Sequence, residues 1–174
     1  MKSKIQKLSI LSVLVSFLFL SNGIAQELTK KELKQNARLE KQKQTQLLIN
    51  SKEFVFVTNI ATPQGGRIIN LTDDYTIEFR SDSIKSELPF FGRGFSGIGY
   101  GGDNGLRFKG KAENYQVEKT KKATIIKAGV RGQQDYFVLM LSIYDSGSAS
   151  LFVSSNNRST IAFNGEIKAV DKNK

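Results

Sequence analysis

The sequence contains neither histidine nor cysteine among its 174 residues. Without histidine, no catalytic triad with a histidine base can form, and a zinc site built from cysteine and histidine is excluded as well. The absence of cysteine also removes cysteine nucleophiles, disulfide bonds and the acylated cysteine of a lipoprotein. The stability of the chain must therefore come from packing and from the pairing of strands.

Carboxylates are the acid–base groups that remain for enzyme chemistry. A glycosidase needs two of them at a defined separation across a cleft, and the sequence does not show which two meet. A Ca²⁺ site using Asp103 lacks the full spacing of a calcium-binding loop. We therefore expect no catalytic residue, no cofactor and no metal; the alternative is a carboxylate-based hydrolase acting on glycan or other envelope material. The candidate acids are Asp73, Asp74, Glu78, Asp82, Glu87, Asp103, Glu113 and Asp135.

The first 25 residues have the order of a secretory signal peptide. Three lysines within the first seven residues precede an apolar run at residues 10–20, and Gly23 and Ala25 place small residues at −3 and −1 of a cleavage site before Gln26. The apolar run is too short for a membrane anchor, which needs about 20 residues. We expect an exported protein, periplasmic or secreted, that begins at Gln26, is soluble after cleavage and keeps no transmembrane anchor.

The mature chain is long enough for one domain and is basic. Cleavage would leave 149 of the 174 residues, and loss of three lysines would lower the net charge from +10 to +7. A basic balance favours acidic partners such as lipid headgroups or acidic glycans. The lysines are interspersed with acids, however, which is typical of a solvated surface. No nucleic-acid partner is expected, and peripheral contact with acidic envelope components stays open.

Residues 26–50 predict an N-terminal helix. Thr29 and Glu32 have the spacing of a capping box, and no glycine or proline interrupts the run that follows. Its apolar face is thin, so this helix either lies on the rest of the domain or bridges it to a partner.

Residues 51–174 predict an antiparallel β domain. Short runs of β-branched and aromatic residues alternate with turn residues, and the gaps are too short for the crossover helices of a parallel sheet. We expect a mainly β fold, either a sandwich or a partly open barrel, with one N-terminal helix. The run at 137–143 is apolar on both faces, which favours a central strand. The expected strands cover residues 54–61, 67–71, 75–80, 106–111, 115–119, 124–130, 136–144, 150–155 and 159–163, and a continuation of the last strand over residues 166–170 stays open.

The stretch at residues 88–105, LPFFGRGFSGIGYGGDNG, contains a literal G-x-G-x-x-G at 92–97. A dinucleotide-binding loop with this pattern follows a strand and opens a helix. Here Pro89 precedes the pattern and further glycines follow it, so a helix cannot start. The pattern predicts instead a glycine-rich edge strand with bulges.

The same stretch holds the candidate binding residues. Adjacent phenylalanines on an extended segment point to opposite faces, and an arginine beside them can bind a carboxylate or phosphate through two hydrogen bonds. The alternative is architectural, with both phenylalanines in the core and Arg93 paired with an acid. Residues 156–157 predict a hairpin turn, after which Arg158 opens the next strand. The candidate surface for a ligand or partner comprises Phe90, Phe91, Arg93, Phe95, Tyr100 and Arg158.

Two segments carry a resemblance to a known family. Residues 88–93 (LPFFGR) and 153–161 (VSSNNRSTI), with the earlier run FVF at 54–56, are similar to domain-of-unknown-function family 4251, small exported proteins typical of Bacteroidota. The resemblance spans roughly residues 35–168. Many members have tyrosine where this chain has Phe90, so a reaction that uses that hydroxyl is not expected here. The resemblance implies export and a single β-rich domain, and it implies no activity.

We therefore favour a non-catalytic module of the envelope, either binding or structural. Its partner would be an envelope ligand or protein that contacts residues 88–105.

Overall fold

A computed structural model of the chain describes residues 29–95, 105–133 and 135–171. The predicted signal peptide and the candidate residues Tyr100 and Asp103 lie outside these ranges. The chain divides into two compact units, residues 1–37 and 38–174. Helix α2 (Lys30–Ser51) begins in the first unit and ends in the second. Among the described residues, we find no helix that is both long and apolar enough to cross a membrane.

The described part of the first unit is the N-terminal end of α2. The backbone N–H of Thr29 donates to Glu32 Oε2 at 2.7 Å, and the backbone N–H of Glu32 donates to Thr29 Oγ1 at 3.3 Å. The predicted capping box is therefore confirmed. These hydrogen bonds hold the pKa of the Glu32 carboxyl below its usual value.

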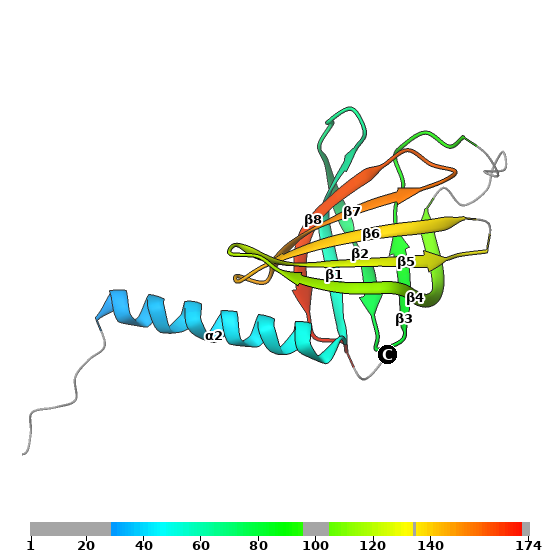
Figure 1. The fold of residues 1–174 in the computed structure, drawn as a ribbon. Coiled ribbons are helices and arrows are strands. Elements are labelled where there is room, and N and C mark those ends of the chain that lie inside the picture. Colours follow the sequence, from blue (N-terminus) through cyan, green and yellow to red (C-terminus); the bar gives the residue numbers. More distant parts are fainter. Residues whose placement is uncertain (1–28, 96–104, 134, 172–174) are drawn as a thin grey trace, which may run out of the picture. The chain divides into compact units, whose positions relative to one another are not determined.

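The second unit contains eight strands that form a closed antiparallel barrel (Figure 1). Each strand pairs with the next along the chain, and β8 pairs with β1. The prediction of a mainly β, antiparallel fold with one N-terminal helix is confirmed, and the sheet closes fully. The strands are β1 Phe54–Pro63, β2 Ile69–Phe79, β3 Ser83–Leu88, β4 Leu106–Lys119, β5 Ala123–Arg131, β6 Tyr136–Tyr144, β7 Ser148–Ser155 and β8 Ile161–Lys168.

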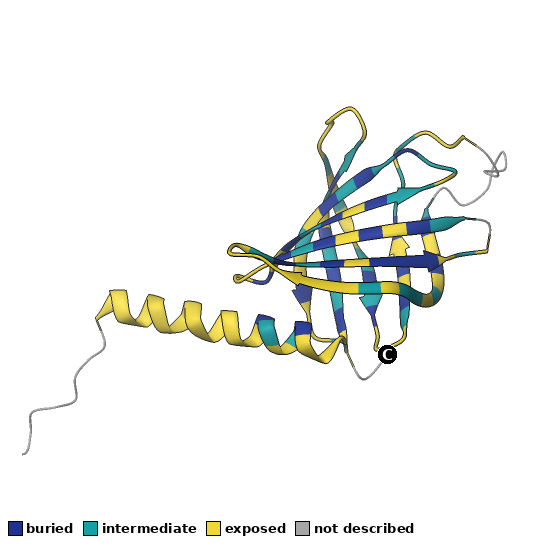
Figure 2. Cartoon of the chain, viewed as in Figure 1, coloured by how far each residue is buried: buried dark blue, intermediate teal, exposed yellow. Residues whose placement is uncertain are grey.

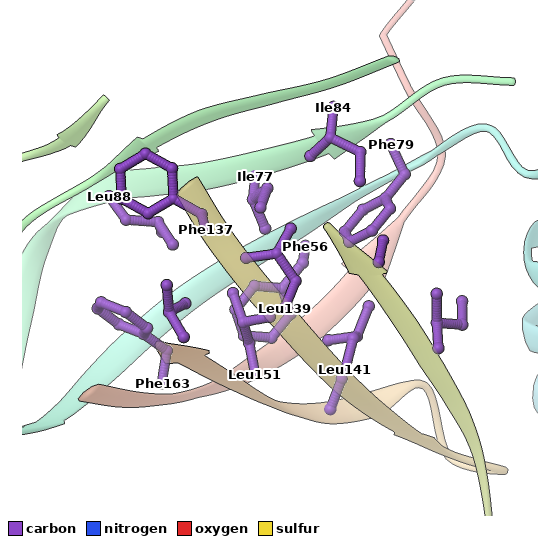
Figure 3. Packing of buried hydrophobic residues seen from close by; sticks show 14 of the residues in the cluster. Phe56, Ile77, Phe79, Ile84, Leu88, Phe137, Leu139, Leu141, Leu151 and Phe163 are labelled. Atoms are coloured by element: carbon purple, nitrogen blue, oxygen red, sulfur yellow. The ribbon is translucent and has the colours of Figure 1, made fainter. Parts of the chain in front are cut away.

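The inside of the barrel is filled by apolar side chains. Buried and exposed residues alternate along most strands, because successive side chains point to opposite faces (Figure 2). Figure 3 shows side chains from different strands, such as Phe56, Leu139 and Phe163, directed into one cluster. Each side chain of this size contributes about 1.5–3 kcal/mol when fully buried. The barrel is therefore a packed core and not an open channel.

Two predicted breaks lie inside continuous strands, and β8 continues at a point where the sequence left continuation open. The turn predicted at residues 72–74 is wrong, because β2 passes through it while β1 shifts register between Thr58 and Ile60. The two strands predicted at 106–111 and 115–119 are one strand, β4, interrupted by a bulge at which Asn114 has φ 51°. Likewise β8 runs through Gly165. A Cβ there would lie 2.0 Å from the carbonyl oxygen of Val57, so the glycine permits close strand approach.

Two further expectations are corrected. Strand β3 was not expected, since it is short and alternates charged with buried residues. The prediction of a central strand at 137–143 is wrong, because a closed barrel has no centre and no edge. Phe137 and Leu139 face the core, whereas Val138 and Met140 are exposed on the outer face.

Because the strands run up and down, their connections lie alternately at the two ends of the barrel. We call one the arginine end and the other the lysine end, after the cations of the described residues that lie in or beside their connections. The arginine end comprises connections 64–68, 89–95 with 105, 132–135 and 156–160, with Arg67, Arg93, Arg107, Arg131 and Arg158. The lysine end comprises 80–82, 120–122, 145–147 and the C-terminal part of α2, with Lys41, Lys43, Lys52, Lys119, Lys121 and Lys122 alongside Arg38 and Arg80.

Residues 38–51 of α2 pack against the lysine end. Thr45 and Ile49 are buried, and Leu48 packs against the core cluster, whereas Leu47 is 68% exposed. The helix thus uses a narrow stripe at its C-terminal end, as the thin apolar face predicts.

Candidate binding surface at the arginine end

After β3 the chain crosses to the turn between β7 and β8. The Phe95 N–H donates to the carbonyl of Asn157 at 2.8 Å, and the Ser159 N–H donates to the carbonyl of Arg93 at 2.9 Å. The Arg93 N–H donates in turn to Ser159 Oγ at 2.9 Å. These contacts bring the two segments that carry the family resemblance together at one end of the barrel (Figure 1).

Gly92 makes this close approach sterically feasible. A Cβ at this position would lie 2.3 Å from Ser159 Oγ and 2.6 Å from Cζ of the Phe90 ring. Any other residue would force the crossing segment away from the turn. The described part of the predicted edge strand, residues 92–95, is therefore an extended segment held against residues 157–159, and residues 96–97 lie outside the described part of the chain.

Phe90 and Arg158 form the structural half of the site. Phe90 is half-buried and packs against the core cluster. The guanidinium carbon of Arg158 lies 5.2 Å from the Phe90 ring centroid, and Arg158 Nη1 donates to the carbonyl of Gly105 at 3.0 Å. Arg158 therefore fastens the turn to both ends of the 89–105 connection. It does not open β8, which begins at Ile161.

Phe91, Arg93 and Phe95 form the outward half. Phe91 is 44% exposed, Phe95 is 67% exposed, and the Arg93 side chain is exposed too. The alternation agrees with an extended segment, on which every second side chain shares a face. Phe90 therefore packs toward the core, whereas Phe91 faces outward, and Tyr100 lies outside the described residues. We call residues 91, 93 and 95 the display segment.

A hollow of about 450 Å³ lies beside the site, between the start of β4, the β5–β6 turn and Arg158. Asp135 Oδ1 accepts a hydrogen bond from the Tyr136 N–H at 2.8 Å, whereas its buried Oδ2 has no partner among the described residues. Asp135 is the single carboxylate of this lining, so the described part of the hollow lacks the facing pair a glycosidase needs. The lining residues are Gly105, Arg107, Phe108, Lys109, Gly132, Gln133, Asp135, Phe137 and Arg158.

Several other acids lie on the outer wall of the barrel, in ion pairs with neighbouring cations. Glu87 lies 2.6 Å from Lys85 Nζ, and Glu166 lies 2.9 Å from Lys168 Nζ. Each contact raises the pKa of its lysine. Such exposed pairs contribute at most about 1 kcal/mol to stability. Among the described residues there is also no group of three or more acids that could hold a metal ion.

The sequence missed three parts of the site. Ser159 and Gly92 supply the close contact between the two segments, and the only sequence signal was their position inside the two resembling stretches. Asp135 was one of eight undifferentiated acids, because its neighbours in the hollow come from distant parts of the chain.

The family comparison covers both segments of the site. The family model DUF4251, a domain of unknown function, matches residues 36–167. The chain belongs to the DUF4251 family. The resemblance noted in the sequence is therefore confirmed, and residues 88–95 and 157–159 both lie inside the match.

A solved relative has the same fold. The crystal structure of a DUF4251 family protein from Bacteroides eggerthii DSM 20697 is similar to this chain with a TM-score of 0.61 and 14% sequence identity. The similarity covers 78% of this chain and 91% of that chain. At this identity the likeness shows the fold alone. No curated protein matches the chain.

Proposed function

We propose that this DUF4251 protein is a non-catalytic binding module of the bacterial envelope and that the display segment is its binding surface. The observation that carries the proposal is the exposure of Phe91 and Phe95 on either side of Arg93, on a segment fixed by hydrogen bonds to residues 157–159. Aromatic residues and arginine are the side chains that most often supply binding energy.

The display segment favours a ligand with an anionic group next to an apolar surface. The Arg93 guanidinium can bind a carboxylate or phosphate through two parallel hydrogen bonds. The exposed phenyl rings offer apolar faces on both sides of it. Because the backbone of the segment is already held in place, less conformational entropy is lost on binding.

Export is part of this proposal. The order of residues 1–25, with lysines, a short apolar run and small residues before Gln26, supports a signal peptide. Mass spectrometry of the protein from its native host would show an N-terminus at Gln26. An N-terminus at Met1 would contradict export by this route.

The binding proposal is tested by affinity capture from native envelope extract. We expect Arg93→Ala and Phe95→Ser to lose a bound component that the wild-type protein retains. Arg67→Ala is the matched control, because Arg67 is also an exposed arginine of the same end but lies outside the display segment. Equal retention by all variants, each shown to be folded by its thermal unfolding, would contradict the proposal.

A further inference from the structure

A second hollow, of about 540 Å³, lies at the lysine end of the barrel. It is bounded by the outer part of α2 and by the β4–β5 and β6–β7 turns, all within the unit formed by residues 38–174. Four cations and one carboxylate line it. We call this hollow the basic groove, and its lining is Arg38, Lys41, Lys121, Lys122, Tyr144, Asp145 and Ser146.

The walls of the basic groove are held together by contacts outside it. Gly147 has φ 83° and is buried beneath the helix, where a Cβ would lie 3.2 Å from Lys41 Cε and 3.3 Å from Thr45 Oγ1. The Ile167 N–H donates to the carbonyl of Gly147 at 2.9 Å, which ties the β6–β7 turn to β8. The spacing of helix and turn is therefore set before any ligand arrives.

The β4–β5 turn, which forms another wall of the basic groove, is also tied to the helix. Lys119 Nζ, at the end of β4, donates to Oε1 of Gln46 at 3.3 Å. This contact places the β4–β5 turn, with Lys121 and Lys122, alongside the helix.

The groove cations differ from those on the barrel wall. On the wall, Lys85 and Lys168 each contact a glutamate. Within residues 29–95, 105–133 and 135–171, none of Arg38, Lys41, Lys121 and Lys122 takes part in an ion pair. Four cations that converge beside a single carboxylate, Asp145, leave an excess of positive charge, which raises the local potential and attracts anions.

We propose that the basic groove binds phosphate-bearing anions. Lysine ammonium groups are compact charges with three rotatable donors, which suits the several oxygens of a phosphate. Tyr144 also lines the groove, and a tyrosine hydroxyl is a neutral hydrogen-bond donor. This site is independent of the display segment, since the two lie at opposite ends of the barrel.

The sequence did not reveal the groove because Lys121-Lys122 looks like a solvated turn in isolation. The folded helix brings Arg38 and Lys41, about eighty residues earlier in the chain, to the same hollow. Convergence of three separate elements, and not the net charge, is the basis of the proposal.

Calorimetric titration with pyrophosphate tests the site. We expect Lys121→Gln combined with Lys122→Gln to weaken pyrophosphate binding at least about tenfold, because two of the four cations are removed. The matched control is Lys111→Gln with Lys127→Gln, which removes the same charge from the barrel wall and should change affinity less than about twofold. If both double variants weaken pyrophosphate binding equally, the effect comes from net charge alone and the proposal is wrong.

Vesicle sedimentation identifies the source of the phosphate. Vesicles of phosphatidylcholine with added phosphatidylglycerol are compared with pure phosphatidylcholine. If a lipid headgroup occupies the groove, the lysine double variant should bind the anionic vesicles about 25-fold more weakly, at about fivefold per lysine. Binding of pyrophosphate without binding of vesicles would assign the groove to a soluble phosphate ester. If folded wild-type protein binds neither probe, the proposal is wrong.

Discussion

The two ends of the barrel are closed in different ways and carry different cations. At the arginine end, the chain between β3 and β4 folds back onto residues 157–159, and Arg158 both stacks on Phe90 and bonds to Gly105. At the lysine end, the C-terminal part of α2 packs against the core through Thr45 and Ile49.

The difference follows from the chemistry of the two side chains. The planar guanidinium of arginine stacks and forms directional hydrogen bonds, so Arg158 can serve as part of the architecture. Lysine keeps a strongly hydrated ammonium on a flexible stem, so the lysines of the basic groove leave their charges available. One end thus presents a fixed surface with aromatic rings, and the other a concentration of positive charge.

The largest expected effect tests whether the two ends of the barrel are stabilised independently of each other. Ile49→Ala should destabilise the protein by about 2–4 kcal/mol, because it removes a side chain that is 5% exposed and anchors α2. Hydrogen exchange should show loss of protection in residues 38–51 while the amides of Arg93 and Ser159 remain protected. Leu47→Ala, on the same helix but 68% exposed, should change stability by less than about 0.5 kcal/mol. Simultaneous loss of protection at both ends would show that the ends are not independent.

The second prediction acts on the arginine end. Gly92→Ala should cost about 1–3 kcal/mol, since its Cβ would lie 2.3 Å from Ser159 Oγ. Urea unfolding measures the cost, and hydrogen exchange should show faster exchange at Phe95 and Ser159 with α2 unchanged. Combining Gly92→Ala with Ser159→Ala removes one of the clashing atoms and should cost less than the sum of the two single changes. Additive costs would contradict the contact.

The third prediction concerns two variants, one that replaces an arginine by lysine at the arginine end and one that replaces a lysine by arginine at the lysine end. Arg158→Lys should cost about 1 kcal/mol, because lysine cannot both stack on Phe90 and reach the Gly105 carbonyl with a planar donor. Lys122→Arg should stay within about 0.5 kcal/mol, since its position is exposed. Urea midpoints of both variants provide the measurement. Equal costs would mean that the type of cation does not distinguish the ends.

The smallest expected effect is a pH dependence at Tyr115 of β4, whose ring centroid lies 5.6 Å from Lys52 Nζ at the lysine end. Burial raises the pKa of the Tyr115 phenol, which normally titrates near 10. The folded state then holds a proton that the unfolded chain releases, so this contribution is present below about pH 10 and lost as pH rises through the folded pKa.

Tyr115→Phe tests this dependence. Urea midpoints between about pH 8 and pH 11 should fall less steeply for the variant than for the wild type, by less than about 1 kcal/mol because Tyr115 is half-buried. At neutral pH the variant should be neutral or slightly stabilising, since the buried hydroxyl has no partner among the described residues. Parallel pH profiles for the two proteins would contradict the assigned burial.

The antiparallel β fold with its N-terminal helix was predictable from local sequence patterns, whereas the closure of the sheet into a barrel was not. The β-branched and aromatic run at 136–144 and the capping box at Thr29 gave the correct elements, because both depend on neighbours in sequence. The bulge in β4 was predicted as a break between two strands, because an asparagine with positive φ resembles a turn in the sequence. At Gly165 the sequence left open whether the strand continues, since only the close approach to Val57 shows why a glycine stands there. Pairing of β8 with β1 joins distant residues and leaves no local signal.

The sequence did not resolve the candidate surface into an inward-facing and an outward-facing half. Adjacent phenylalanines on an extended segment must face opposite ways, yet only the position of Arg158 in space shows that Phe90 is the inner one. The basic groove was not predicted from the sequence, because its lining residues come from a helix and two separate turns.

The most direct test of the account is an amide-resolved NMR titration of the labelled protein with native envelope extract. If the display segment is the binding surface, shifts should concentrate at residues 91–95 and 157–159 and disappear in Arg93→Ala. Shifts confined to other parts of the barrel, or none with any fraction of the extract, would contradict it.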